Sequence, residues 1–288
     1  MAKRTIGWIG LGKMGNPMAE QLLNAGYDVI VFNRSKEKIK SILGKGARAA
    51  NTPADVFRMT DMVFLMVTDD QAVDNICNGQ DGLFSAGVEG RIIVNMSTVS
   101  SKISVAIDAA SRAKKNNYID APVSGSVKQA EEGQLVIVAG GTSPIFEQVK
   151  PLFEKLGKLS LLVGPVGAGN KAKLIINTLL SIHAQGLAEA VTFGEKMGIE
   201  PGVLLTLLNN GALSNFFMKF KGEAIIRGDY AAMFSLSNIA KDLRLAKAEG
   251  LDFPLGNTAY ATFQDAEKEF GNLDIIAIKK EIEEYGIS

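Results

Sequence analysis

Residues 5–15 read Thr5-Ile6-Gly7-Trp8-Ile9-Gly10-Leu11-Gly12-Lys13-Met14-Gly15, a short apolar run followed by a three-glycine turn. The run predicts a buried strand, and the apolar spacing over residues 14–25 predicts a helix. In this context Gly-x-Gly-x-x-Gly is typical of dinucleotide binding. Gly10 permits the tight turn, Gly12 lets backbone approach a pyrophosphate, and Gly15 lets the helix pack closely. The helix N-terminus offers N–H groups to the anion. The predicted cofactor-binding residues are therefore Gly10, Leu11, Gly12, Lys13, Met14 and Gly15.

The end of the second predicted strand, residues 27–32, bears on the choice of cofactor. A site selective for NAD(H) usually places Asp or Glu there, where it binds the ribose 2′-hydroxyl. This chain instead has Asn33, Arg34 and Ser35, and a guanidinium pairs well with a 2′-phosphate. We therefore predict that these three residues bind the cofactor and that the cofactor is NADP(H). Ser35 could also cap the helix that follows.

Composition excludes several classes of protein. The chain has 288 residues, 47% hydrophobic, with a formal net charge of zero, so it can bury a large core in one or two domains. The sequence has no basic stripe of the kind that binds nucleic acid, and it has no run of about 18 apolar residues that could span a membrane. No cluster of side chains has the spacing of metal ligands. The single cysteine, Cys77, fits a reducing compartment. The first strand lies so close to the N-terminus that no signal peptide is expected, and we expect a cytoplasmic protein.

Strand-like runs alternate with helical segments over the first 164 residues. Further strands are predicted at residues 61–67, 91–96, 118–121, 134–139 and 159–163. The alternation predicts a mostly parallel, doubly wound sheet. No clear helix precedes the run at 134–139, which leaves room for an antiparallel strand there.

Helical patterns replace the strands after residue 164. They cover residues 170–197, 201–209, 214–226, 235–249, 254–270 and 275–284. The core is expected to contain Phe216, Phe217, Met218 and Phe220, and contact with the substrate is the alternative for these residues. The predicted fold is α/β, with an N-terminal Rossmann-type domain (1–164) and an all-helical domain (165–288) joined by the long helix. We expect the ligand crevice between the domains, and the long apolar helix predicts a homodimer or homotetramer.

Four segments carry candidate chemistry. They are the glycine turn, Asp120-Ala121-Pro122-Val123-Ser124-Gly125-Ser126, Gly167-Ala168-Gly169-Asn170-Lys171-Ala172-Lys173-Leu174-Ile175-Ile176-Asn177, and Lys241-Asp242-Leu243. Their order and spacing resemble the β-hydroxyacid dehydrogenase family, which includes 3-hydroxyisobutyrate dehydrogenase, over essentially the whole chain. Ser126 and the stretch Ala130-Glu131-Glu132-Gly133-Gln134-Leu135 resemble most the glyoxylate/succinic semialdehyde reductase branch, because other branches commonly have glycine at position 126.

The resemblance implies that Lys173 is catalytic. Reduction of an aldehyde needs a proton donor beside the nicotinamide, and an ammonium group also stabilises the developing alkoxide. Lys171 points about 200° away around the predicted helix and should be solvated. Asn177 lies one turn after Lys173 on the same face, where it could orient the lysine or hold the substrate oxygen. The lone histidine, His183, lies about 280° from Lys173 and is interpreted as structural or interfacial.

Hydroxyl and N–H groups at Ser124, Gly125 and Ser126 could form an anion-binding concavity. The resemblance implies that they bind the substrate carboxylate, and an ordinary turn is the alternative. The resemblance also implies that Lys241 reaches the cofactor and that Asp242 orients the active site. Residues i and i+1 of a helix do not face each other, so we expect these two residues to have separate partners.

Val67, Thr68 and Thr98 follow the ends of two predicted strands. Strand ends of this kind point at the ligand, so we expect these residues near the nicotinamide and its ribose. Helix capping is the alternative for Thr68 and Thr98.

The sequence predicts NADPH-dependent reduction of a small oxo acid or semialdehyde, of the glyoxylate or succinic semialdehyde type, to the hydroxy acid. Lys173 would act as general acid and, in reverse, as general base. A 3-hydroxyisobutyrate-type or tartronate semialdehyde-type dehydrogenase remains an alternative, as does a nucleotide-binding module without catalysis. An imine reductase on the same scaffold would normally have another group in place of the lysine.

Overall fold

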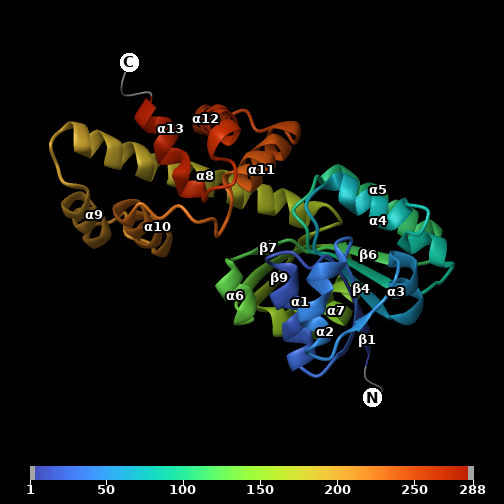
Figure 1. Ribbon diagram of the computed structural model, residues 1–288. Coiled ribbons are helices and arrows are strands. Elements are labelled where there is room, and N and C mark those ends of the chain that lie inside the picture. The colour runs from blue at the N-terminus through green and yellow to red at the C-terminus, as the bar shows by residue number, and fades with distance from the viewer. Residues whose placement is uncertain (1–3, 285–288) are drawn as a thin grey trace. The chain divides into compact units, whose positions relative to one another are not determined.

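The computed structural model describes residues 4–284. Its contacts divide the chain into two compact units, one ending at Lys173 and the other starting at Leu174 (Figure 1).

The first unit is built on a nine-stranded mixed sheet in the order β3-β2-β1-β4-β5-β6-β8-β7, with β9 paired to β8. The strands are β1 (Thr5–Ile9), β2 (Asp28–Phe32), β3 (Arg48–Ala49), β4 (Met62–Leu65), β5 (Ile92–Asn95), β6 (Asn117–Asp120), β7 (Val123–Ser124), β8 (Leu135–Gly140) and β9 (Gly157–Gly164). The strands from β3 to β6 pair in parallel, whereas β8 runs antiparallel to β6 and β7. The predicted doubly wound sheet is confirmed, and the run at 134–139 is its antiparallel strand.

Helices cover both faces of this sheet. They are α1 (Gly15–Asn24), α2 (Lys40–Leu43), α3 (Pro53–Met59), α4 (Asp70–Asn78), α5 (Ser101–Ala113), α6 (Val127–Glu131) and α7 (Ser143–Leu156), with 3₁₀ turns η1 (Lys36–Ile39) and η2 (Leu83–Ala86). Because side chains alternate along a strand, Met62 and Phe64 enter one core and Val63 and Leu65 enter the other. Trp8 stacks on Phe64 in the first of these cores, with ring centroids 5.4 Å apart.

Strand order places the glycine turn at the centre of the sheet. β1 lies between β2 and β4. The chain adds β2 and β3 on one side of β1 and then crosses over to add β4, β5 and β6 on the other side. In open α/β sheets, ligands bind beyond the carboxyl ends of the strands at such a reversal of order. The carboxyl ends of β1, β2, β4, β5 and β6 therefore define the edge that can bind a nucleotide.

The helical unit has its own core. α8 (Ala168–Lys196) begins in the first unit and continues into the second, followed by α9 (Pro201–Asn210), α10 (Phe216–Arg227), α11 (Leu236–Ala248), α12 (Pro254–Phe270), η3 (Ile275–Ala277) and α13 (Ile278–Glu284). Leu187, Val191, Leu236 and Phe263 are among its fully buried side chains. The predicted helix at 275–284 thus starts as a 3₁₀ turn.

Two expectations for the helical segments were wrong. Phe217 and Met218 pack on the core as expected, but Phe216 is 79% exposed and stacks on Phe220. Residues 216 and 220 are one turn apart on the helix, so these two rings cover each other and not the core that contacts Phe217 and Met218. Within residues 4–284, α8 also has the length and apolar composition to cross a membrane, contrary to the sequence expectation. That is a weak indication, because the core helix of a folded domain meets the same criteria and α8 supplies Leu187 and Val191 to the core.

Candidate active site

The glycine turn after β1 has the close approaches that its sequence predicts. Gly10 has φ +102°, and a Cβ there would lie 2.2 Å from the Met66 carbonyl oxygen. A Cβ at Gly15 would lie 2.0 Å from the Gly10 carbonyl oxygen, so α1 could not pack this closely with a larger residue. By contrast, a Cβ at Gly12 would meet no atom within 4 Å. The backbone at Gly12 therefore faces open space that a pyrophosphate could fill.

Asn33, at the end of β2, holds the glycine turn in place. Its side-chain oxygen accepts the Leu11 N–H at 2.8 Å, and its amide donates to the Ser35 carbonyl oxygen at 2.9 Å. Arg34 is exposed, and its guanidinium makes no hydrogen bond or ion pair within residues 4–284. Ser35 precedes η1 but its side chain does not cap it. Asn33 thus serves the fold, while Arg34 and Ser35 remain available to a ligand.

The capping alternative for the two threonines is not what the structure shows. Asp69 caps α4 by accepting the N–H of Ala72, and Ser100 caps α5. Thr68 and Thr98 precede those capping residues and lie in the loops that follow the carboxyl ends of β4 and β5.

Hydrogen bonds tie together the loops after β4 and β5. The Val67 N–H donates to the Ser97 hydroxyl oxygen at 2.9 Å. The Ser100 N–H and hydroxyl donate to the Asp70 carboxylate at 2.8 and 2.5 Å. Val67, Thr68 and Thr98 therefore lie on loops whose relative positions are fixed.

Asp120, at the carboxyl end of β6, anchors the first turn of α8. Its Oδ1 accepts the Gly167 N–H at 2.7 Å, and its Oδ2 accepts the Asn170 N–H at 2.8 Å. Asp120 is fully buried. Burial raises the pKa of its carboxyl above the ordinary value of 3.8, and the hydrogen bonds from Gly167 and Asn170 oppose that rise. A charged side chain in an apolar strand needs such partners, and that requirement is the signal in the sequence that marks this residue.

Asn170 links α8 to the loop that bears Thr98. Its side-chain oxygen accepts the Val99 N–H at 3.0 Å, and its amide donates to the Ser104 hydroxyl at 3.3 Å. Asn170 is fully buried and stands three residues before Lys173. Its partners lie far away in the sequence, so only the three-dimensional contacts reveal its role.

Lys173 and Lys171 have the contrasting environments that the helix geometry predicts. Lys173 is only 8% exposed, whereas Lys171 is exposed. A buried lysine is unusual unless it has partners or a task. Burial therefore singles out Lys173 as the lysine of this segment with a specific environment.

In the helical unit, Asn177 and Asp242 form a buried polar pair. The Asn177 amide donates to Asp242 Oδ2 at 2.6 Å, and the two side chains are almost fully buried. The side-chain oxygen of Asn177 and Oδ1 of Asp242 have no hydrogen-bond partner within residues 4–284. Buried polar atoms left in this way usually serve a ligand or water.

Lys241 and Asp242 correct one expectation. Lys241 Nζ lies 3.1 Å from Asp242 Oδ1, an ion pair without hydrogen-bond geometry. The i,i+1 rule describes the directions of Cβ atoms, but the long lysine side chain folds back over the helix to reach its neighbour. Asp242 therefore has two partners: Asn177, which is the separate partner that we expected, and the neighbouring Lys241, which we did not expect.

The segment after β6 forms a short strand and then a turn. Ser124 pairs with Val136 of β8, Gly125 has φ +147°, and Ser126 begins α6. The Ser124 hydroxyl makes no hydrogen bond within residues 4–284. This turn lies beyond the carboxyl end of β6, on the same edge of the sheet as the glycine turn.

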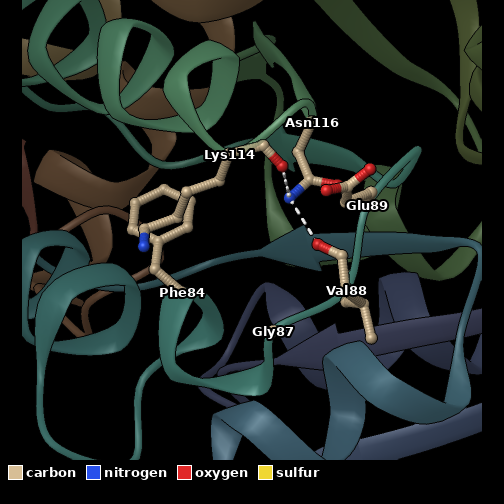
Figure 2. A pocket seen from close by; sticks show the side chains of 6 residues that line it. All are labelled: Phe84, Gly87, Val88, Glu89, Lys114 and Asn116. Atoms are coloured by element: carbon tan, nitrogen blue, oxygen red, sulfur yellow. Dashed lines mark hydrogen bonds between the residues drawn. The ribbon is translucent and has the colours of Figure 1, made fainter.

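A small pocket in the first unit lies at the other end of the strands (Figure 2). Its volume is about 170 Å³, and it lies just before β5 and β6. The Asn116 amide donates to the carbonyl oxygens of Val88 and Lys114, and the Lys114 ammonium lies 6.0 Å from the centre of the Phe84 ring. These contacts are internal, so the pocket is not a candidate active site. Within the part of the chain that the structure describes, no group of His, Cys, Asp and Glu could hold a metal ion.

Comparison with known proteins adds family information to this geometry. Residues 5–167 match the family model for the NAD-binding domain of 6-phosphogluconate dehydrogenase. Residues 167–281 match the model described as NAD-binding of NADP-dependent 3-hydroxyisobutyrate dehydrogenase.

Individual relatives span nearly the whole chain. Glyoxylate/succinic semialdehyde reductase 1 of Arabidopsis thaliana is 34% identical, covering 95% of this chain and 96% of its own. The structure of Psf3 with NADP⁺ and 2-OPP is 26% identical with a TM-score of 0.88, covering 96% and 99% of the two chains. Mycobacterium tuberculosis 3-hydroxyisobutyrate dehydrogenase with L-serine is 25% identical with a TM-score of 0.88, covering 97% and 99%.

Proposed function

This chain belongs to the 3-hydroxyisobutyrate dehydrogenase family of oxidoreductases, and from that premise we propose that it uses NADPH to reduce a small oxo acid or semialdehyde to the hydroxy acid. Glyoxylate and succinic semialdehyde are the proposed substrate types, because the Arabidopsis relative that is named for both matches nearly the whole chain. The burial of Lys173, beside an exposed Lys171, is the observation that carries the proposal.

The environment at the end of β2 supports NADPH as the reductant. Asp28 begins this strand and pairs with Arg48, and no acid stands at its carboxyl end. Arg34 is exposed, and its guanidinium has no partner within residues 4–284, which suits the binding of a 2′-phosphate. The open face of Gly12 suits the pyrophosphate.

In the proposed mechanism, the glycine turn and Arg34 would hold NADPH, which when bound would supply a hydride to the carbonyl carbon of the substrate. Lys173 acts in its ammonium form: as negative charge develops on the carbonyl oxygen, an N–H bond breaks and the O–H bond of the alcohol forms. The neutral amine then regains its proton from water. The Ser124 hydroxyl donates a hydrogen bond to the substrate carboxylate, and the loops that bear Thr68 and Thr98 hold the reacting groups in place.

Asn170 and Asn177 support Lys173 from the same helix. Asn170 fixes the first turn of α8 through its bonds to Asp120 and Val99. Asn177 stands one turn beyond Lys173, and its side-chain oxygen has no hydrogen-bond partner among the residues that the structure describes. We assign Asn170 to positioning and Asn177, with Asp242, to substrate binding and orientation.

Replacing Lys173 by Met tests the mechanism. We expect kcat to fall about 10²- to 10⁴-fold, the typical contribution of a positioned general acid. The KM for NADPH should change less than about twofold. Steady-state assays would follow NADPH absorbance with glyoxylate, succinic semialdehyde, methylmalonate semialdehyde and tartronate semialdehyde.

Lys171→Met is the matched control, because it removes the same ammonium group from an exposed residue that lies two positions before Lys173. It should retain nearly full activity. Undiminished turnover by Lys173→Met would reject the mechanism. A wild-type protein that binds NADPH but reduces none of the four compounds would reject the proposed activity and favour a module without catalysis.

A further inference from the structure

Gln129 folds back onto the turn formed by Ser124, Gly125 and Ser126. It lies in the short helix α6, and its side-chain oxygen Oε1 accepts the Ser126 N–H at 2.7 Å. This bond is one half of a reciprocal capping box between Ser126 and Gln129. The Ser126 N–H therefore already has a partner inside the protein, whereas the Ser124 hydroxyl has none within residues 4–284.

The same amide oxygen also lies against Gly125. A Cβ at Gly125 would be 3.1 Å from Oε1 of Gln129 and 2.7 Å from Cδ2 of Leu135. Together with φ +147°, this crowding means that glycine is needed at position 125. The Gln129 side chain thus touches the turn at two successive residues.

These contacts define what a substrate carboxylate would meet at the turn. A carboxylate needs donors, whereas the Gln129 atom that lies against the turn is its carbonyl oxygen, which accepts the Ser126 N–H. The side chain is neutral, so it contributes no net charge beside the Ser124 hydroxyl. Glutamate is the other residue that completes a capping box at this position, and it would keep the bond while adding a negative charge.

We propose that Gln129 determines the acceptance of acidic substrates: its neutral amide shapes the turn, occupies the Ser126 N–H and leaves the Ser124 hydroxyl to bind the carboxylate without electrostatic repulsion. This inference rests on the proposed reduction of an oxo acid. It adds the residue that determines whether the site accepts a substrate with a carboxylate group. Gln129 acts through the turn and is a specificity-determining residue, not a catalytic one.

The test is Gln129→Glu, which preserves size and the hydrogen bond to Ser126. We expect the KM for glyoxylate and succinic semialdehyde to rise about tenfold, as for two like charges several ångströms apart near a protein surface. The KM for NADPH and the kcat/KM for the uncharged glycolaldehyde should stay within about twofold of wild type. Raising the salt concentration should shrink the effect, because exposed charges are screened.

Gln148→Glu is the matched control, since it adds the same charge at an exposed position of α7. A thermal melt shows whether the variants remain folded. An unchanged KM for the oxo acids in Gln129→Glu, or an equal loss with glycolaldehyde, overturns the inference. Neither outcome contradicts the proposed function. The proposed function is contradicted only if the wild-type protein itself reduces no oxo acid.

Discussion

In the proposed cofactor site, Arg34 is the residue on which we expect the choice between the two nicotinamide cofactors to depend. Arg34→Ala should raise the KM for NADPH about 10- to 100-fold, since a hydrogen bond to a charged group contributes about 1.5–3 kcal/mol. The KM for NADH should not change, because NADH has no 2′-phosphate. Initial rates with both cofactors at a fixed aldehyde concentration measure the two values.

Lys40→Ala is the control for Arg34, because it removes an exposed positive charge from the neighbouring helix α2. It should leave both KM values near those of wild type. Equal losses for NADPH and NADH in Arg34→Ala would contradict a contact with the 2′-phosphate.

Single residues show where sequence-based prediction stops. The buried state of Lys173 and the exposed state of Lys171 follow from helix geometry, which depends on spacing alone. The bonds of Asn170 to Val99 and Ser104 join segments far apart in sequence, so no local pattern indicates them. The ion pair of Lys241 depends on a side-chain conformation, which spacing does not determine.

At the scale of the element, the first turn of α8 depends on one buried carboxylate. Asp120→Asn would place an amide NH₂ group against backbone N–H donors of Gly167 or Asn170. Leaving a buried donor unpaired costs about 1–3 kcal/mol, so we expect a melting temperature several degrees lower.

This loss should depend on pH. Burial raises the pKa of the Asp120 carboxyl, so ionisation is less favourable in the folded protein than in the unfolded chain, and the free energy of unfolding of wild type falls as pH rises from the ordinary value of 3.8 through the raised pKa; the side chain in Asp120→Asn does not titrate. The difference in melting temperature between wild type and Asp120→Asn should therefore be largest at acidic pH and narrow toward neutral pH. Melts between about pH 4 and 8 measure it. Asp81→Asn, at an exposed position, should show neither effect, and a gap independent of pH would contradict the account.

Long, strongly patterned elements were predictable from the sequence, and short ones were not. The helix predicted at 170–197 is α8, Ala168–Lys196, because length and apolar character suffice to define it. β3 and β7 have two residues each, and two residues carry no periodicity, so these strands exist only through their pairing with β2 and β8. α6 has five residues and depends on its capping box.

At the scale of the whole molecule, the helical unit exposes large apolar side chains in a regular pattern. On α8, Leu179 is 56% exposed and Phe193 is 64% exposed. Gly186 stands midway between them, and a Cβ there would meet no atom within 4 Å. Positions 179, 186 and 193 are seven apart and share one face of the helix, and a small residue in the middle allows the close approach of another helix.

We propose that this face of α8 packs against a second copy of the chain. Exchanging Leu179 and Phe193 together for Glu should weaken self-association by at least about a hundredfold, since burying two large apolar side chains contributes about 3–6 kcal/mol. Light scattering over a range of concentrations would then report the mass of one chain, where wild type reports a multiple of it. Val105→Glu tests for a general effect of added charge, because Val105 is an apolar residue of α5 that is 52% exposed in the other unit. If wild type is itself a monomer, or if the double variant keeps the wild-type mass, this face of α8 is not an interface. Its apolar side chains would then need another explanation.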